Sequence, residues 1–110
     1  MPILPEGKEY NINGNKLTLY PISVLATKLS EALGDERTTQ TIRKWEVQGI
    51  IPPAIFRVGQ KRLYAQEQID CICRIAKECN IRQGVSLSLT NFSVRLFQEM
   101  KIINRKLLGK

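Results

Sequence analysis

Five side chains in one short stretch have the types and spacing for a two-sided helix. Ile42 and Trp45 lie three residues apart and can face a core, while Gln40, Arg43 and Lys44 project elsewhere on the same helix. A glutamine can offer adenine a paired donor and acceptor, and an arginine can do the same with guanine or hold a phosphate. A lysine, as a mobile point charge, suits phosphate. This outer face therefore predicts contact with a nucleic-acid duplex.

A second stretch of polar side chains follows in a basic hairpin. Residues 55–58 and 62–64 are predicted strands, and the turn between them, residues 59–61, contains a glycine. Three side chains of this hairpin can reach a minor groove next to the helix, where a narrow A·T stretch attracts cations: Arg57, Gln60 and Lys61.

The helix that carries the first set has recognisable ends. Thr38 or Thr39 can cap its start by accepting from a free backbone N–H, and the other threonine can donate to backbone phosphate oxygen. Gly49 and the pair Pro52-Pro53 stop it, so a helix over residues 39–48 is expected.

The distribution of charge supports a polyanion partner. The chain of 110 residues has a formal net charge of +7. Most of that charge lies between residues 37 and 62, where Glu46 is outnumbered by six cations: Arg37, Arg43, Lys44, Arg57, Lys61 and Arg62. A solvated basic face is the alternative, but such a concentration favours nucleic acid.

The chain before this region predicts a hairpin and a helix. Residues 1–8 are expected to be a flexible leader, and strands over 10–12 and 16–20 flank Asn13-Gly14, a pair suited to a tight turn. From Pro21, which suits a first helical turn, apolar residues follow at helical spacing until Gly34 can close the helix in a left-handed cap: Ile22, Leu25, Ala26, Leu29 and Leu33. Residues 35–37 form the turn to the next helix.

Two more helices are predicted after the basic hairpin. The first covers residues 65–79, with a buried side formed by Ile69, Ile72, Cys73, Ala76 and Cys79. Residues 80–87 are a connector. The last helix covers residues 90–107 and has a continuous apolar seam, Phe92, Leu96, Met100, Ile103 and Leu107, which must be buried on its own domain or against a second copy. We expect a homodimer through this helix, because a two-fold dimer doubles the contacts with DNA.

Several classes of function are excluded by what the sequence lacks. It has no histidine, no glycine-rich phosphate loop and no carboxylate pair suited to acid–base work, so we expect no enzyme and no cofactor. Cys71 and Cys73 are two apart and point to different sides of a helix, which argues against a metal site. No apolar stretch approaches a membrane span or a signal peptide, so a cytoplasmic protein is expected. The length leaves no room for a separate sensing domain, and no small-molecule effector can be inferred.

An ordered set of motifs resembles the MerR-type winged helix-turn-helix family. It begins with Tyr20-Pro-Ile-Ser-Val-Leu-Ala26 and continues through Thr41-Ile-Arg43, Trp45-Glu46 and Gly49-Ile-Ile-Pro52, ending with Arg62-Leu-Tyr64. The similarity covers about residues 20–83. It implies a mainly α, winged helix-turn-helix fold with a β-hairpin wing, and a prokaryotic, phage or plasmid origin. It also implies that Arg62 pairs with Glu46 and fixes the wing, and that Trp45 and Tyr64 pack in the core.

The same residues are similar to phage excisionases, small relatives of that fold. Thr41-Ile-Arg-Lys-Trp45 and Ile50-Ile-Pro-Pro53 fit the excisionase version about as well. Between Ala26 and Thr38 the chain is several residues longer than the compact turn of the family, and only some twenty residues follow Leu89, where a usual MerR protein carries an effector domain.

We therefore expect an N-terminal leader and hairpin over 1–19, a DNA-binding domain over 20–88, and a helix over 89–110 that can serve dimerisation. The leading interpretation is a sequence-specific regulator that contacts double-stranded DNA through Thr38, Thr39, Gln40, Arg43, Lys44, Arg57, Gln60, Lys61 and Arg62. The first alternative is an architectural factor of a mobile element, either excisionase-like or accessory to segregation or recombination. The second is a module whose basic face binds an acidic protein.

Overall fold

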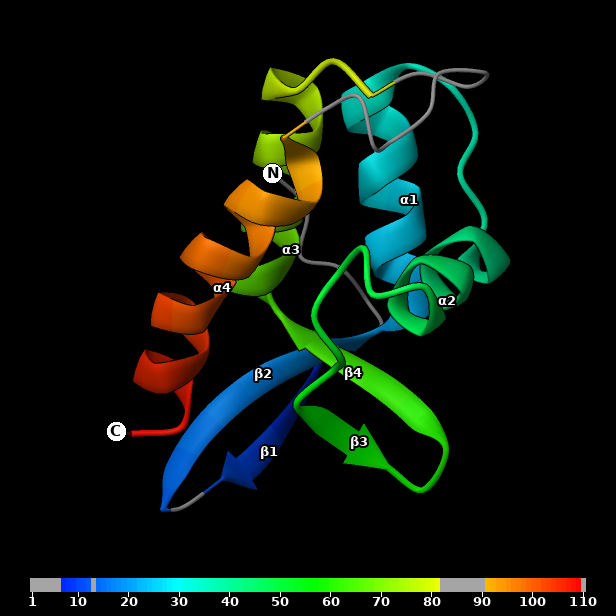
Figure 1. Cartoon of the computed structure of the whole chain (residues 1–110). Coiled ribbons are helices and arrows are strands. Elements are labelled where there is room, and N and C mark those ends of the chain that lie inside the picture. Colours follow the sequence, from blue (N-terminus) through cyan, green and yellow to red (C-terminus); the bar gives the residue numbers. More distant parts are fainter. Residues whose placement is uncertain (1–6, 13, 82–90, 110) are drawn as a thin grey trace.

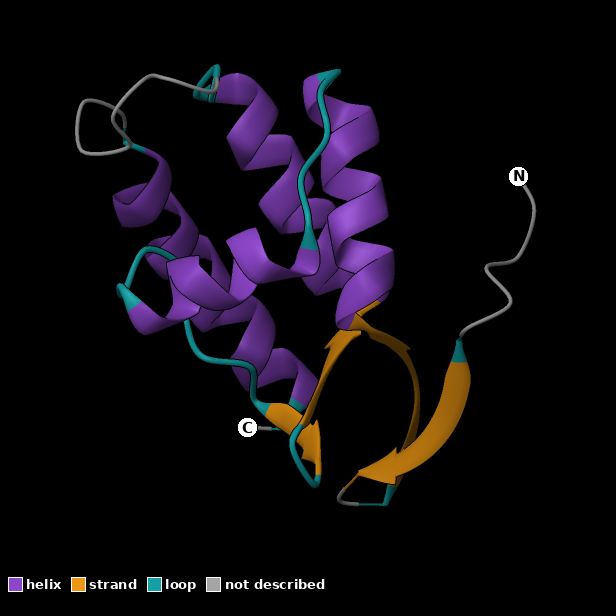
Figure 2. Cartoon of the chain, turned by 90° about the vertical axis from the view of Figure 1, so that its right-hand side faces the viewer, coloured by secondary structure: helices purple, strands orange, loops and turns teal. Residues whose placement is uncertain are grey.

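The chain combines helices with an antiparallel sheet (Figure 1). The computed structural model describes residues 7–12, 14–81 and 91–109. Within them the elements follow the order β1 (Lys8–Ile12), β2 (Asn15–Pro21), α1 (Ile22–Leu33), α2 (Thr39–Val47), β3 (Phe56–Val58), β4 (Lys61–Ala65), α3 (Gln66–Glu78) and α4 (Phe92–Leu107). In Figure 2 the helices gather on one side of the sheet.

The N-terminal hairpin is confirmed. Strands β1 and β2 pair antiparallel, with Tyr10 opposite Leu17, and Gly14 in the turn has a φ of 83°, a left-handed conformation that favours glycine. Lys8 already belongs to β1, so the expected leader over 1–8 is too long by this residue at least. Residues 1–6 and Asn13 lie outside the described residues.

The two hairpins form one sheet, which the sequence did not indicate. The strand order is β1-β2-β4-β3, and β2 pairs antiparallel with β4 through Leu19 opposite Ala65 and Tyr20 opposite Tyr64. A two-stranded hairpin alone is marginally stable in water. The pairing of β2 with β4 therefore supports both hairpins at once, and it fixes the β3–β4 hairpin at the base of α1.

The sheet contributes to two apolar clusters. Tyr20 and Tyr64 belong to the main core, together with residues of all four helices. Leu19 and Leu63, which alternate with them along the strands, belong to a second cluster that includes Leu107 near the end of α4. The C-terminal end of α4 thus packs against one face of the sheet, and it lies near the start of β2 in Figure 1.

Helix α1 ends where the sequence predicts. Gly34 follows Leu33 with a φ of 75°, and its N–H donates to the carbonyl of Ser30 at 2.9 Å. At the other end, Pro21 is the last residue of β2 and the cap of α1, so it precedes the first helical turn rather than lying within it. Its fixed φ of −70° suits this extended position.

The turn from α1 to α2 holds a buried arginine. Arg37 is 8% exposed, its N–H donates to Oγ of Ser30 at 2.7 Å, and its guanidinium forms an ion pair with Asp35 at 3.3 Å. The counting of Arg37 among the cations of the basic surface was therefore wrong. The Arg37 guanidinium stays buried because the backbone of this residue is hydrogen-bonded to Ser30 and because the Asp35 carboxylate lies opposite its charge.

The buried side of α3 is wider than expected and rotated. Ile69, Ile72 and Ala76 are buried as predicted, but the cysteines differ: Cys71 is buried, whereas Cys73 and Cys79 are half-buried. The reason is that α3 contacts α1 on one side and α4 on another, so a single amphipathic stripe underestimates what is covered. Ile75, omitted from the predicted set, is fully buried.

Helix α4 packs on its own domain. Its seam is covered by the chain itself, with Phe92 and Leu96 at 0% exposure and Met100 at 3%. Of the two fates left open for this seam, back-packing is the one observed. At the crossing with α3, buried Gln68 donates to Oδ1 of Asn104 at 2.8 Å and accepts from the N–H of Ala65 at 2.8 Å. The start of the predicted helix, Thr90, lies outside the described residues.

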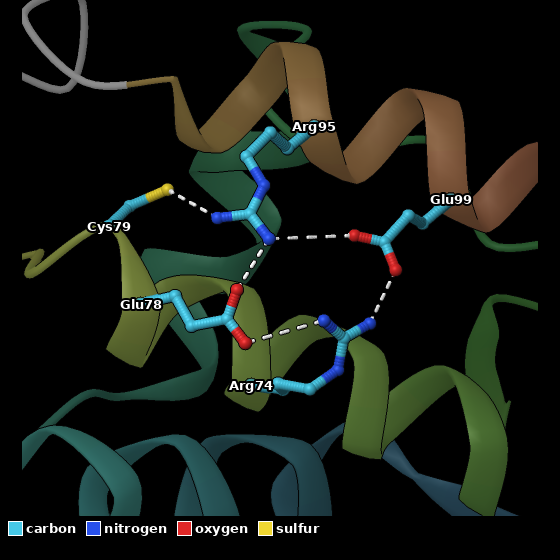
Figure 3. A network of polar contacts seen from close by, with 5 residues as sticks. All are labelled: Arg74, Glu78, Cys79, Arg95 and Glu99. Carbon is cyan, nitrogen blue, oxygen red and sulfur yellow. Dashed lines mark hydrogen bonds and ion pairs between the residues drawn. The ribbon is translucent and has the colours of Figure 1, made fainter.

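A ring of alternating charges adds a second tie between α3 and α4 (Figure 3). Arg74 pairs with Glu78 of its own helix and with Glu99 of α4, and Arg95 of α4 pairs with the same two carboxylates. Arg95 also donates to Sγ of Cys79 at 3.9 Å. All four charged side chains are substantially exposed, so water and salt screen this ring and the apolar seam contributes more to the packing.

Candidate nucleic-acid interface

Helix α2 is short and capped at its start. The N–H of Thr41 donates to Oγ1 of Thr38 at 3.3 Å, so Thr38 is the cap and Thr39 is the first helical residue. Of the two threonines proposed for this role, the geometry selects the first. At the other end Gly49 has a φ of 75°, and the chain leaves the helix toward Pro52.

The inner side of α2 anchors it to the core. Ile42 is 1% exposed and Trp45 is 7% exposed, which confirms both as core residues. The Trp45 ring meets the ring of Phe92 edge-on, with 5.5 Å between the centroids. This contact joins α2 directly to α4, a helix 45 residues further along the chain.

The outer side of α2 is open to solvent. Gln40, Arg43 and Lys44 are all exposed. Neither Arg43 nor Lys44 forms an ion pair with another described residue. The two cations are therefore available to an anionic partner.

Glu46 fastens the β3–β4 hairpin to α2. Its Oε1 accepts from Nη2 of Arg57 at 2.8 Å and from Nε of Arg62 at 3.0 Å, and its Oε2 accepts from the N–H of Ala54 at 3.0 Å. The Arg62–Glu46 pair implied by the family resemblance is confirmed. Arg57 is a second partner that sequence reasoning missed; 42% of its side chain remains exposed.

The environment of Glu46 keeps its carboxylate charged. The side chain is 7% exposed, and burial alone would raise its pKa. Hydrogen bonds from Arg62 and Ala54, with the positive charges of Arg62 and Arg57, outweigh burial and leave the pKa of Glu46 lowered. The folded state therefore gains stability from this carboxylate above the unfolded pKa, and loses it as the pH falls through the lower, folded pKa.

We expect Glu46→Gln to destabilise the protein by about 2 kcal/mol at pH 7, because two arginines lose a charged acceptor. As the pH falls through the lowered, folded pKa of Glu46, the difference from the unaltered protein should shrink, since the carboxylate then becomes protonated in the folded state as well as in the unfolded state. Urea unfolding at pH 7 and at an acid pH below the folded pKa of Glu46 measures this. Glu67→Gln, which removes an exposed partner of Lys106, is the matched control with an effect under about 1 kcal/mol. Equal destabilisation at both pH values would show that the charge of Glu46 contributes nothing.

A cleft of about 810 Å³ lies between α2 and the β3–β4 hairpin. It brings together five of the nine predicted contact residues, and its lining consists of Pro21, Ile22, Arg43, Arg57, Gly59, Gln60, Lys61 and Arg62. Thr38, Thr39, Gln40 and Lys44 are not in this lining; the last two lie on the exposed surface of α2 and Thr39 is half-buried. Four cations from three elements, α2, β3 and β4, thus surround one concave surface.

The remaining candidates have structural explanations. Tyr64 is 1% exposed, which confirms its packing role, and burial raises its pKa to about 12. Cys73 is half-buried, and burial raises the pKa of its thiol to about 12 as well. Within the described residues, no three histidine, cysteine or acidic side chains gather as metal ligands, and no helix has the length and apolarity to cross a bilayer.

The capped helix α2, its packing against α1 and the adjoining antiparallel hairpin define a small helix-turn-helix domain. The family model described as MerR HTH family regulatory protein matches residues 20–88, more than half of the chain. The chain belongs to this family of DNA-binding transcription regulators. Comparison with curated proteins and with solved structures gave no match. Strand β1 and helix α4 lie outside the matched residues.

Proposed function

We propose that this protein is a sequence-specific regulator that reads the major groove of double-stranded DNA with α2 and contacts the adjacent minor groove or backbone with the β3–β4 hairpin as a wing. The observation that carries this proposal is the cationic cleft, in which Arg43 of α2 faces Arg57, Lys61 and Arg62 of the hairpin. A duplex offers phosphates on both sides of a groove, at the positions where such a cleft presents its cations.

Each side chain has a distinct role in this proposal. Gln40 and Arg43 meet base edges, with Arg43 able to hold a phosphate instead, and Lys44 binds phosphate. Thr38 keeps α2 capped, and the hydroxyl of Thr39 donates a hydrogen bond to a phosphate oxygen of the DNA backbone. In the wing, Gln60 and Lys61 reach outward from the turn. Arg57 and Arg62 are positioned by Glu46, and the exposed part of Arg57 remains free to approach a phosphate.

The experiment that tests this function is the selection of binding sites from random duplexes, with the mass of the complex measured. We expect one motif with two-fold symmetry and an affinity that falls steeply with salt. Equal affinity for selected and random duplexes at moderate salt would remove sequence-specific regulation. Cooperative loading on tandem copies of a site, with a bend in the DNA, would instead indicate the architectural role of an excisionase.

We further propose that residues 20–88 are the DNA-binding unit, residues 1–19 its N-terminal extension, and residues 89–110 the dimerisation element. Because the seam of α4 is buried on its own chain, a second copy must use the outer face of the helix. Phe97 is 40% exposed there and lines a groove of about 390 Å³ with Pro52, Gln98, Lys101 and Asn104. An exposed aromatic ring beside a groove is suited to an interface.

We expect Phe97→Glu to convert a homodimer into a monomer, because a charge would enter the apolar contact. Sedimentation of the full chain measures the change in mass. Ile102→Glu is the control: Ile102 is 71% exposed, but it projects about 100° away from Lys101 around the helix, outside the groove. If both variants keep the mass of the unaltered protein, the outer face of α4 is not the dimer interface.

A further inference from the structure

Val47 is an apolar side chain in an unusual place. It is the last residue of α2 and is 81% exposed, more than any other large apolar side chain in the described part of the chain. Residues seven apart in a helix share a face, so Val47 lies on the same outer side as Gln40, one turn beyond Arg43 and Lys44. It therefore belongs to the surface that the proposed function places against the major groove.

The neighbours of Val47 identify the kind of partner that would cover it. Arg43 and Lys44 are exposed cations, and Gln48, which follows, is exposed and polar. A protein partner that binds an apolar surface needs a contiguous patch of several hundred Å². Val47 is a single valine beside two exposed cations, so this face suits a partner that is anionic overall and offers one small apolar group among its polar groups.

DNA has such a group. In the major groove each thymine presents a C5-methyl group beside the hydrogen-bonding edges of the bases, and the phosphates that frame the groove supply the negative charge. A valine at the end of a helix whose cations hold the phosphates can pack on that methyl group. The chemistry on the helix and the chemistry of the groove are then complementary in both charge and polarity.

We propose that Val47 packs against the C5-methyl group of a thymine and thereby makes α2 select a T·A pair at one position of each half-site. This inference rests on the proposed function and extends it, because it assigns a base preference to a residue without hydrogen-bonding groups. Gln40 and Arg43 select by hydrogen bonds, while Val47 selects by apolar contact.

The test replaces the thymines of a selected duplex one at a time by uracil, which keeps base pairing and removes only the methyl group. At one thymine position of each half-site, the unaltered protein should bind the uracil-substituted duplex about fourfold more weakly than the thymine duplex. This is the factor expected for one buried methyl group. Val47→Ala should bind the thymine and uracil duplexes equally at that position. It should stay folded, because the side chain is exposed.

The control is Val94→Ala, the same change at a 61% exposed site on α4. It should retain the fourfold ratio between thymine and uracil duplexes, whatever its effect on overall affinity. A specific site at which no thymine shows this ratio, or a ratio that persists in Val47→Ala, would overturn the inference and leave the proposed function standing. Failure to select any specific site would overturn both.

Discussion

Replacing Arg43 and Lys44 together by alanine is expected to weaken binding to the selected DNA by about 100-fold or more. An arginine paired with guanine contributes roughly 1–3 kcal/mol of discrimination, and 1.4 kcal/mol corresponds to a factor of ten. Each lost phosphate contact should also lower the slope of log affinity against log salt by about 0.9. The single variants then distinguish the two roles of Arg43, because the loss of a base contact relaxes preference at one position, whereas the loss of a phosphate contact weakens all sequences alike.

The control for this pair removes the same two charges elsewhere. Lys77 on α3 and Arg105 on α4 are exposed and lie outside the lining of the cleft. Lys77→Ala with Arg105→Ala should therefore change affinity only through the net charge of the protein. Titration of labelled duplex at several salt concentrations measures both pairs. If the two double variants lose affinity equally, the face of α2 has no special role and binding depends on total charge.

The local features of the fold could be predicted because they depend on neighbouring residues. Gly34 and Gly49 adopt the left-handed conformations that end α1 and α2. The hydroxyl of Thr38 caps α2, and the 3.6-residue period places Ile42 and Trp45 inside. Each of these depends on interactions over a few residues, which a sequence pattern records directly.

The features that the sequence did not indicate depend on contacts between distant segments. The pairing of β2 with β4 joins residues about 45 positions apart, and neither strand carries a signal for its partner. The rotation of α3, which buries Cys71 rather than Cys73, follows from the placement of α4 over that side. The burial of Arg37 also depends on its contacts. An arginine is expected at the surface, but a hydrogen bond with Ser30 and an ion pair with Asp35 hold Arg37 in the interior.

The candidate site shows the same division. Residue type and spacing were enough to predict that Arg43 and Lys44 project outward from α2. They were not enough to show that Glu46 binds Arg57 as well as Arg62, because one carboxylate can serve two arginines only when the hairpin folds back over α2. Val47 was missed for a different reason. Its apolar character suggested no chemistry until its exposure was known.

The contact between Trp45 and Phe92 makes the helix outside the family match a support for α2. Phe92 is fully buried, and its ring packs on the tryptophan whose helix carries Arg43 and Lys44 on the opposite side. We expect Phe92→Ala to destabilise the protein by about 3–5 kcal/mol, the usual cost of removing a buried aromatic ring. This is a large share of the roughly 5–15 kcal/mol that holds a domain of this size together.

Ile102→Ala is the control on the same helix, because its side chain is 71% exposed and should cost under about 0.5 kcal/mol. Urea unfolding followed by Trp45 fluorescence, with tryptophan present once in the chain, reports on the contact itself. If Phe92→Ala lowers the free energy of unfolding by less than about 1 kcal/mol, the stability of the domain does not depend on the packing of α4. A loss of the expected size would mean that the packing of Phe92 on Trp45 supports α2, the helix that carries the side chains proposed to contact DNA.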